Sequence, residues 1–134
     1  MILLDTHVLL WLRLGSPRLG SRARRLLGHA WADGDAAVST ITFWEIGLLV
    51  AKGRLEVDID VESWRFELLT DGLIEVPVRG DIAARSGVLP DMHGDPGDRI
   101  ITATAITVPG CRLLTADERL LDWPGRLDRL DART

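Results

Sequence analysis

Short apolar runs alternate with longer segments of helical periodicity along this chain, and this alternation restricts the folds open to it. The runs expected to be strands are 1–5, 36–39, 73–76 and 112–114, with one further edge strand near 126–130. The segments expected to be helices are 6–14, 18–32, 43–52, 61–71, 81–87, 96 or 98 to 107, and 116–121. Strands that alternate with helices form a parallel sheet with helices on both faces. We therefore expect an α/β protein with three α/β/α layers around a central, mainly parallel sheet.

Length and composition indicate one domain that spans residues 1–134. An apolar fraction of 46% and a charged fraction of 27% are typical of a globular protein. No uncharged stretch is long enough to cross a membrane, and Asp5 interrupts the apolar amino terminus, which argues against a signal peptide. The single cysteine, Cys111, is expected to be a buried thiol. These features predict a cytoplasmic protein.

The formal net charge of −4 and the absence of a long basic run argue against a protein that coats nucleic acid by charge alone. They do not argue against a nuclease, because a bound metal ion can supply local positive charge.

Four acidic residues stand where an apolar run gives way to a helical segment: Asp5, Glu45, Asp98 and Asp117. In a parallel α/β sheet, the helices that follow the strands begin at one rim, where ligands bind. Four carboxylates in one crevice would repel one another unless a divalent cation lay between them. Oxygen ligands without a nearby cluster of cysteine and histidine favour Mg²⁺ or Mn²⁺ over structural zinc. The pattern predicts a metal-dependent enzyme that acts on phosphates, with RNA as the favoured substrate.

Each acid also has a structural interpretation at a helix start. Asp5 can cap the helix that follows it, and Asp95 can cap the helix that contains Asp98. Thr42-x-x-Glu45 and Thr115-x-x-Glu118 both match the spacing of a capping box. The two interpretations are compatible, because a carboxylate in a first turn is held in place by its helix.

Four blocks of sequence carry a family resemblance. They are 1–11 (MILLDTHVLLW), 39–46 (STITFWEI), 95–105 (DPGDRIITATA) and 114–118 (LTADE). In order and spacing they resemble the PIN domain, and more closely the VapC-type toxins of prokaryotic toxin–antitoxin pairs. The resemblance covers essentially the whole chain.

The resemblance implies a PIN-like fold and an Mg²⁺- or Mn²⁺-dependent endoribonuclease that is the toxin of a type II toxin–antitoxin system. It also implies a homodimer and a small VapB-like antitoxin that binds and blocks the site. Transferred position by position, the metal-binding and catalytic acids would be Asp5, Glu45, Asp98 and Asp117, with Thr6 and Thr115 as supporting hydroxyls. Close relatives often carry an aromatic residue where this chain has Gly97, so the loop before Asp98 is expected to be more mobile here.

The expected reaction is hydrolysis of an RNA phosphodiester by a metal-activated water, which leaves a 5′-phosphate. Asp5 would be the central ligand, because it ends a strand expected in the middle of the sheet. Asp98 and Asp117 would complete the metal shell. Glu45 would hold a second metal or orient the attacking water as general base, and the number of metals stays open.

Further polar residues near the acids have more than one role open to them. His93 is either an acid, a ligand or a substrate contact, or an ordinary loop histidine. Asp95 is expected to be the cap of the helix rather than a metal ligand. Arg99 is expected to contact phosphate or to pair with a neighbouring acid. His7 is expected to be a solvated or partly buried helical histidine.

The five tryptophans divide by their place in the pattern. Trp11, Trp44 and Trp64 lie within apolar helical stripes and are expected in the core. Trp31 and Trp123 lie nearer the ends of elements and are expected to be partly exposed. Following the resemblance, an exposed apolar patch around the second and third helices is expected to contact a dimer mate or an antitoxin helix.

Two other classes of function fit parts of the pattern. A response-regulator receiver or a haloacid-dehalogenase-like phosphatase also uses aspartates at strand ends. The receiver needs a late lysine, and the only lysine is Lys52; the phosphatase needs an aspartate where this chain has His7. The alternative of a non-catalytic PIN-fold interaction module gives no chemical reason to keep four like charges together. The RNA that is cut stays open, and single-stranded loops are the expected targets.

Overall fold

Five short strands form one sheet in which every neighbouring pair of strands runs parallel. The computed structural model describes all of residues 1–134. The strands are β1 (Ile2–Leu4), β2 (Ala36–Ser39), β3 (Ile74–Val76), β4 (Arg112–Thr115) and β5 (Arg129–Asp131), in the spatial order β3-β2-β1-β4-β5. The predicted parallel sheet is confirmed, and the edge strand predicted near 126–130 is β5.

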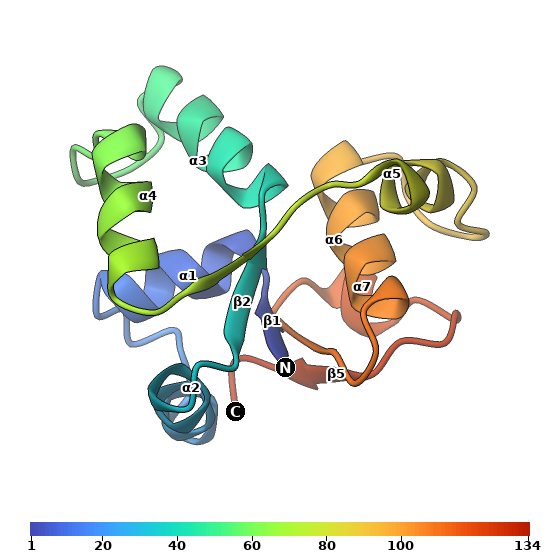
Figure 1. The fold of residues 1–134 in the computed structure, drawn as a ribbon, viewed down its shortest axis with the longest axis horizontal. Helices are drawn as coiled ribbons and strands as arrows, with labels where there is room; N and C mark the ends of the chain where they lie inside the picture. Colours follow the sequence, from blue (N-terminus) through green and yellow to red (C-terminus); the bar gives the residue numbers. More distant parts are fainter.

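Seven helices cover the two faces of this sheet, as Figure 1 shows. They are α1 (Thr6–Arg13), α2 (Ser21–Ala32), α3 (Ile41–Ala51), α4 (Val61–Thr70), α5 (Gly80–Gly87), α6 (Pro96–Thr107) and α7 (Glu118–Leu121). Helices α1 to α4 pack on one face, and α6 and α7 pack on the other, with α5 against α6. The three-layer α/β/α arrangement is therefore confirmed.

Successive residues of the inner strands point to opposite layers, as the period of a strand requires. In β1, Leu3 packs with α6 and α7, whereas Leu4 packs with α1 to α4. Leu113 and Leu114 of β4 divide in the same way. All four side chains are at most 1% exposed, so these short strands are apolar on both faces because both faces are covered.

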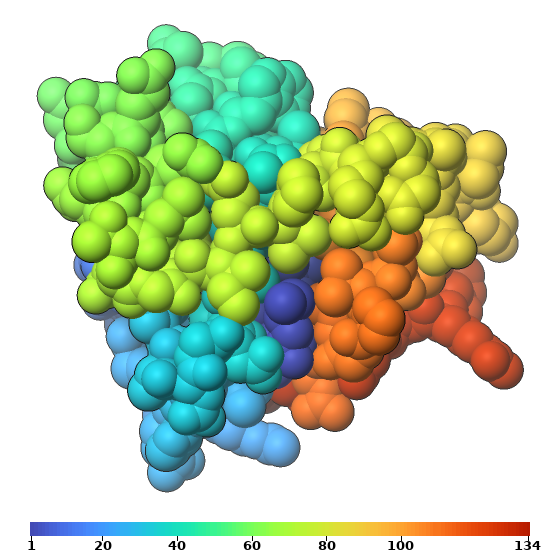
Figure 2. All heavy atoms as spheres, viewed as in Figure 1, coloured from blue at the N-terminus to red at the C-terminus, as the bar shows by residue number.

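The order of the strands places a topological switch point beside β1. The chain adds β2 and β3 on one side of β1 and then returns to add β4 and β5 on the other side. Figure 2 shows β3 and the residues after it running across the surface between α4 and α5. Ligands of such sheets bind where this reversal occurs, at the carboxyl ends of the strands. Asp5 directly follows β1 at this place, and its backbone N–H donates to the carbonyl of Leu114 at 3.0 Å.

Both predicted capping boxes are wrong. Helix α3 begins at Ile41, so Thr42 and Glu45 both lie inside the helix and neither caps it. Helix α7 begins at Glu118, because Asp117 is its N-cap and accepts a 2.9 Å hydrogen bond from the N–H of Arg119.

Two tryptophans lie elsewhere than predicted. Trp44 is 53% exposed, because Phe43 and Ile46 form the buried side of α3. Trp123 is only 5% exposed, because the residues after α7 fold back and its indole N–H donates to the carbonyl of Pro90 at 2.8 Å. No helix combines the length and the apolar character needed to cross a membrane.

Candidate metal centre

Hydrogen bonds through two threonines link three of the four predicted acids. The Thr115 hydroxyl donates to Asp5 Oδ2 at 2.6 Å and accepts from the N–H of Asp117 at 3.0 Å. The N–H of Thr6 donates to Asp5 Oδ1 at 2.8 Å, and its hydroxyl donates to Glu45 Oε1 at 2.6 Å. The contacts run in the order Glu45, Thr6, Asp5, Thr115, Asp117. Both threonines therefore hydrogen-bond to predicted site acids, and their supporting role at a metal stays a prediction.

The fourth acid, Asp98, joins this group through a histidine and an arginine. Asp98 lies in the first turn of α6, and its N–H donates to Asp95 Oδ1 at 2.9 Å, so Asp95 is the helix cap that the sequence predicts. His93 Nε2 lies 2.6 Å from Asp98 Oδ2. The Arg119 guanidinium lies 3.3 Å from Asp98 Oδ2 and 3.0 Å from Asp117 Oδ2. One potential ligand atom from each of His93, Asp98 and Asp117 lies within 4.8 Å of the others.

Burial and mutual repulsion disfavour the charged forms of three of these acids. Burial, and then the neighbouring acids, raise the pKa of Glu45 to about 7 and that of Asp98 to about 6, although Thr6 and His93 oppose the shifts. Burial also raises the pKa of Asp5. Burial also disfavours the charged form of Asp117, but hydrogen bonds from Arg119 outweigh this effect. The net result is a lowered pKa for Asp117. Ionisation of the Asp5, Glu45 and Asp98 carboxyls is therefore unfavourable unless a cation lies nearby.

Comparison with known proteins follows this geometry. The family model described as the PIN domain matches residues 2–125. The chain belongs to the PIN domain family. It is 37% identical over 120 residues to Ribonuclease VapC22 of Mycobacterium tuberculosis, across 89% of this chain and 88% of that protein.

Two solved structures resemble this PIN domain over nearly all of its length. A toxin–antitoxin complex from Klebsiella pneumoniae matches with a TM-score of 0.64 and 25% identity, over 98% of both chains. VapBC2 from Rickettsia felis, solved bound to a DNA fragment from the promoter, matches with a TM-score of 0.62 and 17% identity, over 92% of this chain and 94% of that one. The second likeness is one of fold alone.

The residues present in this PIN domain fit a divalent cation. Asp5 is 4% exposed, and the side chains that donate to Asp5 and Glu45 are neutral threonine hydroxyls. The cationic side chain that contacts the other two acids is Arg119, which is itself 60% exposed. Clustered carboxylate oxygens suit a hard divalent cation, and burial followed by the neighbouring acids raises the pKa of Glu45 and Asp98, so a bound cation would offset a cost that these carboxylates otherwise bear.

Arg99 has a role that the sequence did not predict. Its guanidinium forms no salt bridge. It donates instead to the backbone carbonyls of Ser86, Gly87, Leu89, Met92 and His93, at 2.8–3.3 Å. The predicted pairing of Arg99 with a neighbouring acid is therefore wrong, and its predicted contact with phosphate stays a prediction. The residue fixes the loop before α6 and with it the position of His93.

Three features of the site were not predicted from the sequence: the contacts of Arg119, the contact of Thr42 with Thr6, and the close approach of Gly97 to Glu45. The Thr42 and Thr6 hydroxyls lie 3.0 Å apart. Gly97 lies inside α6, not in the loop, and a Cβ atom there would come within 2.4 Å of Glu45 Oε2. An arginine two residues after a site acid was the one available signal for Arg119. The other two contacts join α3 to α1 and α6, and no local pattern predicts them.

Proposed function

We propose that this PIN domain is a divalent-metal-dependent endoribonuclease that hydrolyses RNA phosphodiester bonds, and that it is the toxin of a type II toxin–antitoxin pair. The observation that carries the proposal is the linkage of Asp5 to Glu45 and Asp117 through two threonine hydroxyls. Membership of the PIN domain family and the 37% identity to a protein named a ribonuclease support it.

Asp5, Asp98 and Asp117 would hold Mg²⁺ or Mn²⁺, and Glu45 would either hold a second ion or act as the general base. When bound, the metal would lower the pKa of a coordinated water and offset negative charge on the phosphate. The Thr6 N–H and the Thr115 hydroxyl occupy one oxygen each of Asp5 and fix its orientation. Such outer contacts orient metal ligands and tune their affinity.

Glu45 is the proposed general base. Thr6 donates to Glu45 Oε1, which leaves Oε2 to accept the proton of the attacking water. In the metal-free protein, burial and then the neighbouring acids raise the pKa of Glu45 to about 7, and a carboxyl with a raised pKa is a stronger base than an ordinary one. The reaction would leave a 5′-phosphate and a 3′-hydroxyl. His93 would position Asp98 through their 2.6 Å contact.

The proposed partners are an RNA substrate, a small VapB-like antitoxin and a second copy of this chain. The titles of the two similar structures, a toxin–antitoxin complex and VapBC2, support the antitoxin. Exposed apolar side chains near α4, Val57 at 42% and Phe66 at 71%, offer surface for a protein partner. Action on cellular RNA implies a cytoplasmic location.

The test is cleavage of a mixed cellular RNA pool by purified protein with Mg²⁺, with Mn²⁺ and with chelator. We expect metal-dependent cutting that leaves 5′-phosphate ends. The Asp5→Asn variant should melt like the wild type and cut nothing. If antitoxin-free protein cut no RNA with either metal, the proposal would fail and the non-catalytic interaction module would take its place.

A further inference from the structure

A pocket of about 200 Å³ opens beside Glu45 and extends along one face of α3. Thr6, Glu45 and Gly97 line it, so the pocket is continuous with the candidate metal centre. Trp44, Leu48 and Lys52 also line it, at intervals of four residues, which places them on one face of the helix. At about 1.5 Å per residue this face is roughly 12 Å long.

Trp44 gives this pocket an exposed aromatic surface. The side chain is 53% exposed, more than is usual for so large an apolar group. The indole N–H groups of Trp31 and Trp123 donate to backbone carbonyls, whereas that of Trp44 has no partner in the protein. Unstacked RNA bases stack on such exposed rings.

Lys52 and Arg54 give the same pocket two positive charges. Neither forms a salt bridge, although six of the arginines elsewhere in the chain do. Both side chains are exposed. In a protein of net charge −4, two unpaired cations beside an acidic centre are available to bind a phosphate.

We propose that this pocket binds a nucleotide of single-stranded RNA next to the bond that is cut. The base stacks on Trp44, and the backbone phosphate lies between Lys52 and Arg54. The inference rests on the proposed ribonuclease function and adds where the substrate is held. The pocket positions RNA and performs no chemistry of its own.

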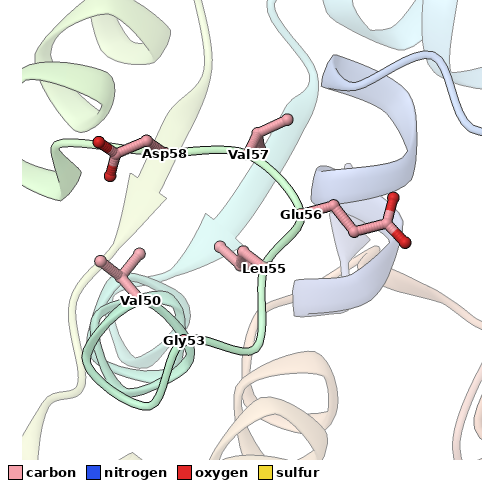
Figure 3. A pocket seen from close by; sticks show the side chains of 6 residues that line it. All are labelled: Val50, Gly53, Leu55, Glu56, Val57 and Asp58. Carbon is pink, nitrogen blue, oxygen red and sulfur yellow. The ribbon is translucent and has the colours of Figure 1, made fainter.

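A second pocket of the molecule lacks the features that suit the first pocket to RNA. It has a volume of about 280 Å³ and lies in the connection between α3 and α4, as Figure 3 shows. Leu55 and Val50 point into it, and its charged lining residues are Glu56 and Asp58. It has no aromatic side chain, no cation and none of the four site acids, so it does not suit RNA.

The first test measures RNA binding without cleavage. A fluorescein-labelled single-stranded RNA oligonucleotide of mixed sequence is titrated with the Asp5→Asn protein in chelator, and fluorescence anisotropy is recorded. Adding Trp44→Ala should weaken binding about tenfold. Adding Lys52→Ala with Arg54→Ala should weaken it and reduce the slope of log affinity against log salt by about 0.7 for each cation. The same oligonucleotide in duplex form should not respond to Trp44→Ala.

Two exposed residues away from the pocket supply matched controls. Val88→Ala removes an exposed apolar side chain that follows α5, and Arg25→Ala removes an exposed cation of α2. Both controls should bind RNA like the Asp5→Asn parent. Equal binding by the pocket variants and the parent would overturn the proposal. So would Trp44→Ala if it changed self-association in sedimentation and left RNA affinity intact, because the face would then belong to a protein interface.

The second test separates this inference from the proposed function. In protein with an intact Asp5, Trp44→Ala and Lys52→Ala should raise the KM for RNA cleavage and leave kcat near the wild-type value. If these variants cut RNA with an unchanged KM, the proposal for the pocket would fail and the ribonuclease function would stand. If RNA binding depended on Trp44 in a protein that never cuts RNA, the proposal for the pocket would stand and the ribonuclease function would fail.

Discussion

The hydroxyl of Thr115 donates a 2.6 Å hydrogen bond to Oδ2 of Asp5, across 110 positions of sequence. Thr115→Val should therefore leave Asp5 free to turn and weaken metal binding or activity by about 10- to 100-fold. Thr115→Ser is the control, because it keeps the hydroxyl and should stay close to wild type. Mn²⁺ titration by calorimetry measures the affinity directly. Equal affinities in the valine and serine variants would contradict this role for the hydroxyl.

The stability of the metal-free protein should fall as pH rises. Glu45, with a pKa raised from 4.5 to about 7, and Asp98, raised from 3.8 to about 6, bind protons more tightly in the folded chain than in the unfolded one. Between the ordinary and the raised values the folded state carries more protons, so deprotonation favours unfolding. Melting in chelator at several pH values between about 4 and 8 should show a falling Tm.

Two variations on this experiment identify the groups involved. Glu45→Gln should remove the part of the fall that ends near pH 7. Added Mn²⁺ should raise Tm more at high pH than at low pH, because the metal competes with protons for the same oxygens. A Tm that rose steadily across this range in chelator would show that the two carboxyls are not destabilised by burial.

Gly97→Ala should impair activity without harming the fold. The added Cβ would lie 2.4 Å from Glu45 Oε2, so the Glu45 carboxylate would have to move away. A displacement of this size can cost up to about 100-fold in rate. Alanine also favours a helix over glycine by about 1 kcal/mol, so the Tm should hold or rise. Gly47→Ala in α3 is the control, since nothing lies within 4 Å of its Cβ position; equal activity in the two variants would show that Glu45 tolerates the shift.

Arg119→Ala should strengthen metal binding a few-fold. The guanidinium contacts carboxylate oxygens of Asp98 and Asp117 that a metal ion would also coordinate. Its removal takes away a competing cation, and the effect is small because Arg119 is 60% exposed. Mn²⁺ affinity is the readout, and Arg112→Ala, which breaks an exposed pair with Asp128, is the control. Weaker Mn²⁺ binding in Arg119→Ala would mean that the arginine holds the acids in place.

Arg99→Lys should loosen the loop between α5 and α6. A lysine keeps the charge but cannot donate to five carbonyls, so the backbone that Arg99 holds would lose its anchor. Hydrogen exchange of residues 86–94 should become faster, while the strands stay protected. Arg85→Lys, which alters one contact to Thr107, should exchange like wild type. Unchanged exchange in Arg99→Lys would show that the loop is held by other contacts.

Much of the fold could be predicted from the sequence because its signals are local. Short apolar runs and helical periodicity gave the parallel sheet, and Asp95 before Pro96 gave the start of α6. The four acids converge because parallel strands end at one rim, which is a property of the fold class.

The contacts that hold the acids could not be predicted from local sequence signals. Arg99 directly follows the acid Asp98 in sequence, yet its partners are five backbone carbonyls whose positions depend on the packing of α5 against α6. Trp44 sits in an apolar stripe, but Phe43 and Ile46 took the buried side of α3. Which residue of a stripe faces outward depends on the rotation of the helix, and tertiary packing sets that rotation.

The position of β1 between β2 and β4 decides when this protein can act. Asp5 is synthesised first, but its strand keeps an open edge until Arg112–Thr115 has emerged and paired with it. Thr115 and Asp117, which complete the acidic cluster, arrive with that same strand. A nascent chain or a truncated product that stops before β4 therefore contains most of the protein and no assembled centre. Under the proposed function, cellular RNA meets an active nuclease only after the crossover that places β4 beside β1 has formed, which delays cutting until most of the chain has been synthesised.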